Sequence, residues 1–348
     1  MGFDWKRGVL PQATRLVTTL DVHAAGEPLR IITSGLPEIA GSTMLERRRW
    51  MQAHLDDVRK ALMWEPRGHH NMYGCVVVPP VIAGSDLGVL FFHNEGYSTM
   101  CGHGVIALVT ALLDTGTLPV VGADTPVVLD TPAGRVHATA HLGADGRVAR
   151  VSFLNVPSFV SARDLSVNIP GIGTVVLDVA FGGAFYAIVP AARVGLRVEP
   201  ALLPRLVEVG EEIKRATIQA LTLVHPTEPD LGFLYGTIFV GPPETSAHHS
   251  RNICIFADAE VDRSPTGTGV SARLAVHAMR EELAVGQEVE FESILGASSV
   301  FSGRIVGATT VGPFPAIIPE ISGTAYLTGW HEFVLDPHDT LGSGFLLP

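Results

Sequence analysis

The sequence has few cysteines, few charged residues and no long unbroken apolar run. Its three cysteines, Cys75, Cys101 and Cys254, have no paired spacing, so we expect neither a disulfide framework nor a zinc knuckle and consider each thiol alone. Charged residues make up 17% of the chain and hydrophobic residues 47%, which predicts a globular protein because a disordered chain would carry more charge. The most apolar stretch, 173–196, is interrupted by Asp178, paired glycines and a proline, which favours two strands over a membrane span.

Basic residues are also scarce. The 24 lysines and arginines are outnumbered by 35 aspartates and glutamates, for a formal net charge of -11. A surface that binds nucleic acid or an anionic membrane needs a clustered basic face, so we expect neither partner and a small-molecule ligand instead. The first twenty residues contain no apolar core followed by a small-residue cleavage site, which predicts a cytoplasmic protein without a secretory signal. The length suits two domains of ordinary size.

Short strand-like runs separated by Gly, Pro, Asn and Asp dominate the chain, from RLVTTLDVHA at 15–24 to NICIFADAE at 252–260. Helical periodicity is confined to four segments, at about 42–64, 102–114, 200–222 and 268–284. The chain is therefore predicted to be α+β. The second of these helices, GVIALVTALL in its centre, is apolar almost all round, which is typical of a helix enclosed by sheet.

A short sequence motif occurs twice. CGHGVIA from Cys101 and TGTGVSA from Thr266 agree at both glycines, the valine and the alanine, 165 residues apart, and each begins an apolar helix after a strand that ends near a phenylalanine. We interpret this as an internal duplication. It predicts two similar halves whose helix N-termini converge on one interdomain cleft, the usual place for a ligand.

The repeated motif can carry chemistry. A thiol at a helix N-terminus lies in the positive end of the helix dipole, which predicts a lowered pKa for Cys101 and a role as base or nucleophile. The amides of Gly102, His103 and Gly104, and their counterparts at Gly267–Gly269, are positioned to bind a carboxylate. The alternative is that Cys101 is buried filler, as free cysteines often are; we assign that structural role to Cys75 and Cys254.

Other motifs are weaker. GTGVSA satisfies the G-x-G-x-x-A pattern of dinucleotide folds, but the surrounding βαβ alternation is missing. The adjacent pairs His69-His70 and His248-His249 point in different directions on a helix or strand and lack a carboxylate at metal-binding spacing, so no metal site is expected. No G-x-S-x-G elbow of a serine hydrolase is present.

Several long blocks together resemble the proline racemase family. They cover most of the chain: DVHAAGEPLRII at 21–32, RGHHNMYG at 67–74, HNEGYSTMCGHGVIAL at 93–108, FGGAFYAIV at 181–189, DRSPTGTGVSARLA at 262–275 and ISGTAYLTGWHEFVLDPHDTLGSGFLL at 321–347.

The resemblance implies a diaminopimelate-epimerase-like α+β fold with two pseudo-symmetric domains, each a β-barrel-like sheet around a central helix. The active site would lie in the interdomain cleft, without a cofactor. We expect an N-terminal domain of 1–160 plus 325–348 and a C-terminal domain of 161–324. The resemblance also favours a homodimer.

The sequence departs from the racemase pattern at one position. The resemblance implies two cysteines on opposite faces of the substrate α-carbon; here Cys101 is the first, and Thr266 holds the place of the second. A hydroxyl is too weak an acid to replace a thiol at neutral pH, so two-base racemisation should fail and the carbanion should eliminate a ring hydroxyl. The Cys/Thr pair resembles that of the family's trans-3-hydroxy-L-proline dehydratases.

The resemblance also implies roles for further residues. Cys101 would accept the α-proton, Thr266 would hydrogen-bond the departing hydroxyl or a water on the opposite face, and Asp262 would hold the ring ammonium with the His103 imidazole nearby. Main-chain amides would bind the substrate carboxylate: those of Gly102, His103, Gly267 and Thr268. His23, Glu27 and residues 69–73, among them His69 and His70, are assigned no chemical role, and we interpret them as scaffolding around the cleft.

Two other functions stay open. One is a hydroxyproline 2-epimerase or related isomerase, in which a water held by Thr266 acts as the second acid. The other is an amino-acid-binding protein without activity. The intact Cys101 and its glycine turn argue against the second of these.

Overall fold

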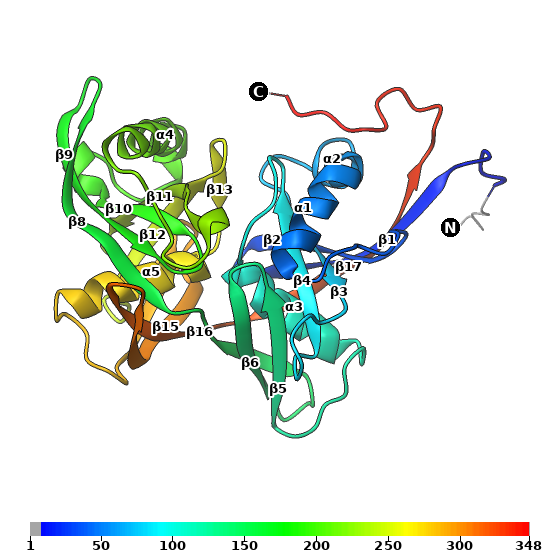
Figure 1. Ribbon diagram of the computed structural model, residues 1–348, viewed down its shortest axis with the longest axis horizontal. Helices are drawn as coiled ribbons and strands as arrows, with labels where there is room; N and C mark the ends of the chain where they lie inside the picture. The colour runs from blue at the N-terminus through cyan, green and yellow to red at the C-terminus, as the bar shows by residue number, and fades with distance from the viewer. Residues whose placement is uncertain (1–7, 348) are drawn as a thin grey trace.

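The computed structural model describes residues 8–347, which form two lobes side by side (Figure 1). The N-terminal lobe contains β1–β7, β17 and the helices α1–α3, and the C-terminal lobe contains β8–β16, α4 and α5. No α-helix in the described part of the chain is both long and apolar enough to cross a membrane.

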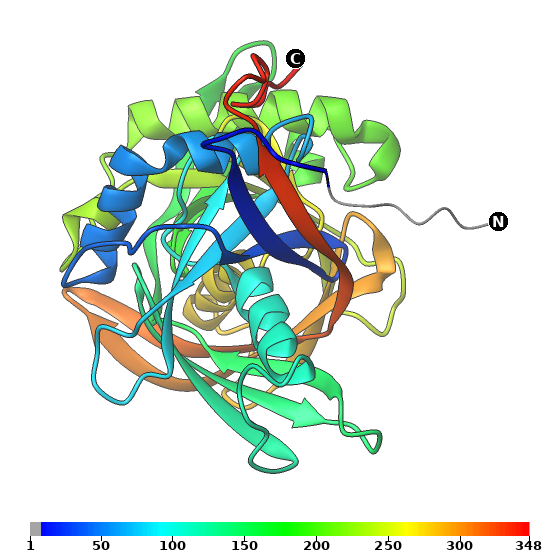
Figure 2. The same cartoon turned by 90° about the vertical axis from the view of Figure 1, so that its right-hand side faces the viewer.

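The elements of the N-terminal lobe are β1 (Arg15–Ala24), β2 (Glu27–Ser34), α1 (Met44–His54), α2 (Asp56–Met63), β3 (Tyr73–Val78), β4 (Leu87–His93), α3 (Gly102–Asp114), β5 (Asp124–Thr131), β6 (Gly134–Leu142), β7 (Val148–Leu154) and β17 (Ala325–Leu335). The strands pair in the order β17-β1-β2-β3-β4-β5-β6-β7, and β7 pairs with the end of β16. Because β16 runs on into β17, the strands surround α3, as the view onto this lobe shows (Figure 2).

The elements of the C-terminal lobe are β8 (Ser158–Ile169), β9 (Gly173–Phe181), β10 (Phe185–Pro190), η1 (Ala191–Val194), η2 (Pro200–Leu202), α4 (Leu203–Ala220), η3 (Pro229–Leu231), β11 (Leu234–Gly241), β12 (Ser250–Phe256), β13 (Glu260–Asp262), α5 (Gly267–Met279), β14 (Glu288–Ser293), β15 (Gly296–Val311) and β16 (Phe314–Gly323). Eight strands close on themselves in the order β8-β9-β10-β11-β12-β14-β15-β16-β8. This ring encloses α5, while α4 lies outside it.

The two central helices are buried for a reason visible in their sequences. Every residue of α3 from Gly102 to Leu113 is buried, and so is every residue of α5 from Gly267 to Val276. Aliphatic and small side chains on all sides of a helix can be buried only when sheet surrounds it. The α+β fold of two sheets, each wrapped around one helix, is therefore confirmed.

The helix predictions are confirmed with two differences. The segment predicted as one helix at 42–64 is divided at Leu55, whose ψ of 18° ends α1 before α2 begins. A capping box between Thr43 and Glu46 starts α1. The last helix ends at Met279 rather than 284, because Glu281 adopts a left-handed φ of 57°.

The strands after α5 are not among the runs singled out in the sequence, although β14–β17 supply much of both sheets. The apolar stretch 173–196 forms β9 and β10, as predicted. We propose that the two lobes correspond to the expected domains, 1–160 plus 325–348 and 161–324, with the first boundary nearer residue 157, because β8 begins at Ser158. The passage from β16 to β17 returns the chain to the first lobe (Figure 1).

Candidate active site

Cys101 is the N-cap of α3. Its backbone is extended, with φ of −144° and ψ of 113°, and its Sγ accepts a hydrogen bond from the Gly104 amide at 3.3 Å. The thiol is 5% exposed and also lies 3.2 Å from His103 Nδ1. The thiol therefore sits at the opening of the helix, as the sequence predicted, with an imidazole within reach of its proton.

The expectation of a lowered thiol pKa is wrong for the free protein. Burial raises the pKa of Cys101 well above its ordinary value; the Gly104 amide lowers it, but the charge of Asp262 raises it further. Burial also lowers the pKa of His103 below its ordinary value. Desolvation outweighs the helix N-terminus here, so thiol and imidazole are both neutral near pH 7.

Thr266 occupies the equivalent position before α5 in a different conformation. Its φ of 64° and ψ of 92° lie in a region that a β-branched residue rarely adopts. Its hydroxyl is buried, and Oγ1 makes no hydrogen bond of normal geometry among the described residues, with the Cys254 thiol as its polar neighbour. A buried hydroxyl without a partner is costly, and such strain is found where a side chain is held for function.

The two helix starts touch through their glycines. A Cβ placed on Gly102 would lie 2.5 Å from the Gly267 Cα, and one placed on Gly267 would lie 2.7 Å from the Gly102 Cα. Only glycine permits this approach of two backbones. Cys101 and Thr266 line one cavity beside this contact, so the predicted convergence of the two helix N-termini is confirmed.

Five more of the residues selected from the sequence also line this cavity: Gly102, His103, Asp262, Gly267 and Thr268. Gly104 and Gly269, whose amides were also expected to bind the carboxylate, do not line it, and the Gly104 amide is bonded to Cys101 Sγ. The first backbone N–H groups of α3 and α5 have no carbonyl acceptor within their own helix. The cavity therefore combines a thiol, a hydroxyl and two sets of helix N-terminal amides, an arrangement suited to a carboxylate.

Asp262 supplies the negative charge of the site. Its carboxylate is 6% exposed, and its Oδ1 accepts a hydrogen bond from the Ser264 amide at 2.8 Å. No cationic side chain in the described part of the chain forms an ion pair with it. A buried carboxylate without a cation is unfavourable unless a ligand provides one, so Asp262 is suited to bind an ammonium group.

Glu27, which the sequence analysis interpreted only as scaffolding around the cleft, holds the segment that carries Asp262. Its Oε2 accepts hydrogen bonds from the Arg263 amide at 2.7 Å and from Arg263 Nη1 at 3.2 Å. Burial raises the pKa of Glu27 well above its ordinary value, and the charge of Asp262 adds to this effect. Arg263 also donates to the Asn71 carbonyl at 3.1 Å, so residues 69–73 help to join the lobes.

Sequence reasoning missed the aromatic part of the cavity. Its further lining residues are Tyr73, Met100, Tyr186, Tyr235, Cys254 and Phe256. The tyrosines are connected to polar neighbours: the Ser98 hydroxyl bonds Tyr235 at 2.8 Å and also bonds Tyr73, and Tyr186 bonds the Thr268 hydroxyl at 2.7 Å. Strand patterns reveal buried positions but not which of them face a cavity. Of these residues, only Tyr73 belongs to a segment, 69–73, that the sequence placed around the cleft.

Cys254 requires a correction. It is fully buried, as a core residue should be, but it also lines the cavity on the side of Thr266 and Asp262. Burial raises the pKa of its thiol well above the ordinary value, and the charge of Asp262 raises it further. Cys75 is a core residue as expected, since it is fully buried in β3 and does not line the cavity.

The two histidine pairs lie outside the cavity. His69 and His70 contact main-chain carbonyls, whereas His248 contacts Glu290 and Glu292. Within residues 8–347, no group of three or more His, Cys, Asp or Glu side chains has the geometry to hold a metal ion. The His23 ring lies against the Tyr326 ring at a tilt of 34°, with ring centroids 5.5 Å apart.

The enclosed cavity is small, about 20 Å³, which is room for about one water molecule. A ring amino acid is several times larger, so its entry requires movement of side chains or of the lobes. Beside the cavity the lobes are joined by His93 Nδ1 and Glu260 Oε1 at 2.8 Å, both side chains being buried.

A family model described as Proline racemase matches residues 19–346. Trans-3-hydroxy-L-proline dehydratase of Bacillus cereus is 46% identical over 336 residues, which cover 97% of this chain and 99% of the relative. A protein of Burkholderia multivorans named 3-hydroxyproline 2-epimerase is 44% identical over 334 residues and covers 96% of this chain and 99% of its own length.

Solved structures agree. A hydroxyproline epimerase from Agrobacterium vitis with bound trans-4-hydroxy-L-proline superposes with a TM-score of 0.89 at 33% identity, covering 96% of each chain. A Bacillus anthracis protein of the PhzF family has a TM-score of 0.56 at 14% identity and shares only the fold. Both the sequence match over almost the whole length and the common fold show that this chain belongs to the proline racemase family.

Proposed function

We propose that this chain is a trans-3-hydroxy-L-proline dehydratase, a hydro-lyase that forms Δ1-pyrroline-2-carboxylate without a cofactor. The observation that carries the proposal is the single cavity shared by the Cys101 thiol, the Thr266 hydroxyl and the unpaired Asp262 carboxylate. The 46% identity to the trans-3-hydroxy-L-proline dehydratase of Bacillus cereus supports trans-3-hydroxy-L-proline as the substrate. A cytoplasmic location and a homodimeric state remain expectations for this protein.

The substrate charges match the cavity. The amides of Gly102, His103, Gly267 and Thr268 would bind the carboxylate, and Asp262 would bind the ring ammonium. That ammonium brings positive charge beside Cys101, which favours the thiolate over the thiol. His103, with Nδ1 3.2 Å from Sγ, is placed to accept the proton.

The reaction then needs one acid-base group on one face of the ring. In the trans isomer the hydroxyl lies opposite the carboxylate and therefore on the same face as the α-hydrogen. The Cys101 thiolate removes that hydrogen, the C–H electron pair forms the C2–C3 double bond, and the C3–O bond breaks. The new Cys101 thiol protonates the departing hydroxide, which restores the thiolate and releases water. The enamine product tautomerises to the imine.

This stereochemistry assigns Thr266 to the opposite face, as one of the two roles expected for it from the sequence. A hydroxyl or a water held by Thr266 Oγ1 cannot readily deliver a proton to the α-carbon, because the pKa of either group is far above neutral pH. The carbanion therefore loses hydroxide before it is reprotonated. The amides around the carboxylate stabilise the charge that develops on it.

A 2-epimerase is the second candidate, and the Burkholderia multivorans relative named 3-hydroxyproline 2-epimerase favours it. The two functions are separated by incubating the protein in D2O with trans-3-hydroxy-L-proline, its cis isomer, L-proline and trans-4-hydroxy-L-proline, followed by NMR. We expect imine from the trans-3 isomer and little from the cis isomer, whose hydroxyl lies on the face away from Cys101. If the main product is hydroxyproline with deuterium at an inverted α-carbon, the protein is an epimerase and not a dehydratase. Binding without turnover would leave an amino-acid-binding protein.

A further inference from the structure

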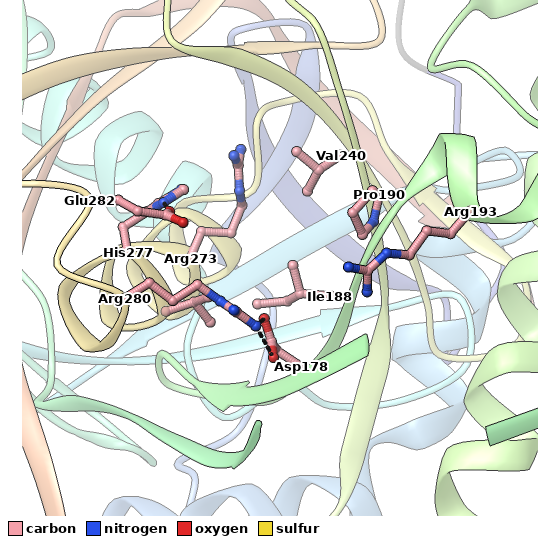
Figure 3. A pocket seen from close by; sticks show the side chains of 10 residues that line it. Asp178, Ile188, Pro190, Arg193, Val240, Arg273, His277, Arg280 and Glu282 are labelled. Carbon is pink, nitrogen blue, oxygen red and sulfur yellow. Dashed lines mark hydrogen bonds and ion pairs between the residues drawn. The ribbon is translucent and has the colours of Figure 1, made fainter. Parts of the chain in front are cut away.

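A second cavity, of about 260 Å³, lies in the C-terminal lobe beside the last turns of α5 and shares no lining residue with the active-site cavity (Figure 3). The arginines that line it already have partners. Arg280 is paired with Asp178, as the dashed lines show (Figure 3). The Arg273 guanidinium donates to Asn252 and Ser250. These groups are satisfied without a ligand, whereas the tyrosines of the active-site cavity form hydrogen bonds that lead to the reacting thiol.

Three hydroxyl groups form a chain across the interface between the lobes. Tyr235, in β11 of the C-terminal lobe, bonds the Ser98 hydroxyl at 2.8 Å, and Ser98 bonds the hydroxyl of Tyr73, in β3 of the N-terminal lobe. The hydroxyl oxygens of Tyr73 and Tyr235 are 3.4 Å apart. Both tyrosines line the active-site cavity together with Cys101. This hydroxyl chain, Tyr235–Ser98–Tyr73, therefore runs from one lobe to the wall of the cavity that holds the thiol.

The rings that carry these hydroxyls are held by aromatic packing. Tyr73 lies edge-on to the His103 ring with centroids 4.8 Å apart, and Tyr235 stacks on Phe256 with centroids 5.2 Å apart. Burial raises the pKa of both tyrosines well above the ordinary value. Both hydroxyls therefore stay protonated near neutral pH and can donate a hydrogen bond.

The protons of the hydroxyl chain can be arranged in one way that serves a thiolate. Each hydroxyl has a single proton to donate. If Tyr73 donates to the Cys101 thiolate, Tyr73 accepts from Ser98, and Ser98 accepts from Tyr235. Every hydroxyl then donates once and accepts once. A hydrogen bond to an ionised acceptor is stronger than one to a neutral acceptor, and hydrogen bonds in a chain polarise one another, so this arrangement favours the thiolate over the thiol.

The titratable groups around Cys101 mostly disfavour its ionisation. Burial raises the pKa of the thiol, and the carboxyl groups of Asp262 and Glu27 raise it further. His103 Nδ1 is 3.2 Å from Sγ, but burial lowers the pKa of this imidazole, so it adds no positive charge. Hydrogen bonding by the Tyr73 side chain lowers the pKa of the thiol. Among these side chains, Tyr73 is the one that favours the thiolate in the free protein.

We infer that Tyr73, Ser98 and Tyr235 are positioning residues whose hydroxyl chain stabilises the Cys101 thiolate, and that the chain is complete only when the two lobes meet. Tyr235 belongs to the C-terminal lobe and the other two hydroxyls to the N-terminal lobe, so opening the lobes removes the first donor of the chain. Closure over a substrate and formation of the base are thereby coupled. The inference rests on the proposed function, in which Cys101 removes the α-proton, but its test needs no turnover.

The test is the rate at which iodoacetamide alkylates Cys101 in the free protein as a function of pH. Peptide mass spectrometry separates Cys101 from the other two thiols, and the midpoint of the profile reports ionisation of the thiol whatever the absolute rate. Tyr235→Phe keeps the ring and removes the hydroxyl. It should move the midpoint to higher pH by about half a unit to one unit, or about threefold to tenfold less thiolate at a given pH, the usual effect of losing one hydrogen bond. Ser98→Ala breaks the hydroxyl chain at its centre and should give a similar shift, which keeps the test valid if Tyr235→Phe does not fold.

Tyr186→Phe is the matched control, because Tyr186 lines the same cavity but its hydroxyl bonds Thr268 at 2.7 Å and lies outside the hydroxyl chain. The Cys101 midpoint should not move in this variant. A shift in Tyr235→Phe or Ser98→Ala without one in Tyr186→Phe supports the inference. It does so even if the protein fails to dehydrate hydroxyproline, which would remove only the proposed reaction. An unchanged midpoint in folded Tyr235→Phe and Ser98→Ala would overturn the inference, and so would an equal shift in Tyr186→Phe.

Discussion

The starts of α3 and α5 share a backbone plan but differ in every property that matters for proton transfer. Cys101 is an N-cap in ordinary extended geometry whose Sγ accepts the Gly104 amide. Thr266 is held at a φ of 64°, and its Oγ1 makes no hydrogen bond of normal geometry among the described residues. Between them, Gly102 and Gly267 are in backbone contact. The scaffold is symmetric, but the chemistry on its two sides is not.

The two halves share the glycines that bring the helix starts together but not the residue that precedes them, which under the proposed function means a common carboxylate site without a matched acid-base pair. Glycine is required on both sides, because any Cβ at the contact would separate the helix starts. The first residue of each motif is under no such constraint, and in the proposed function it determines the reaction. There, a thiol on one side and a hydroxyl on the other would favour elimination over inversion.

The largest effect should come from removing the sulfur. Cys101→Ser should lower turnover by about a hundredfold to ten-thousandfold, because a positioned acid-base group contributes about that much. The fold should survive, since serine is a favourable N-cap. Steady-state assays and thermal unfolding measure both effects. Cys75→Ala, which removes a buried thiol outside the cavity, is the control and should keep its activity; equal losses in the two variants would remove the special role of Cys101.

The next largest effect should come from forcing the two helix starts apart. Gly102→Ala places a Cβ 2.5 Å from the Gly267 Cα, and a displacement of about 1 Å at a catalytic site can cost about a hundredfold in rate. Gly96→Ala, whose added Cβ would meet nothing within 4 Å, is the matched control. Full activity in Gly102→Ala would show that the contact between the halves does not position the site.

Asp262→Asn should weaken substrate binding without disturbing the loop, because asparagine can still accept the Ser264 amide. Weakening the charged hydrogen bond to the buried ammonium should reduce kcat/KM by about tenfold to a hundredfold. The ring-oxygen analogue tetrahydrofuran-2-carboxylate carries no ammonium and should bind the variant at least as well as the original protein. An equal loss for both ligands would mean that Asp262 shapes the cavity but does not hold the ammonium.

The pH profile sharpens the assignment of the base. Burial raises the pKa of Cys101, so the thiolate fraction of the free protein increases with pH and kcat/KM should rise by up to about tenfold per pH unit through neutrality. The charge of Asp262 also raises this pKa, so Asp262→Asn should move the rising limb to lower pH. If the rising limb of the kcat/KM profile does not shift in Asp262→Asn, a group other than Cys101 controls it.

The smallest effect concerns the strain at Thr266. Thr266→Gly permits the left-handed φ and removes a buried hydroxyl without a normal hydrogen bond, so it should stabilise the protein by about 1 kcal/mol while turnover falls. Thr266→Ser keeps the hydroxyl and the strain and should change neither property much. Differential scanning calorimetry measures the shift, and a destabilised glycine variant would contradict the account of strain.

Patterns of apolar residues predicted the two enclosed helices well, since GVIALVTALL has no polar face to expose to solvent. The repeated glycines predicted the meeting of the two helix starts. Strands β14–β17 were missed because many of their residues are exposed, so these strands lack the dense apolar runs by which the other strands were recognised. The lining tyrosines and Cys254 were missed because a buried strand position does not reveal what it faces. The prediction of a lowered pKa for Cys101 was wrong, because the sequence reveals the position of the thiol at a helix start but not how deeply it is buried.

Thr266→Cys tests the central contrast most directly, because it restores sulfur to the second side. The variant and the original protein are incubated with L-proline in D2O, and the α-position and its configuration are followed by NMR and chiral chromatography. We expect α-deuterated D-proline from the variant and none from the original protein. Inversion of L-proline by the original protein, or no inversion by a folded variant, would contradict the placement of a proton donor on only one face.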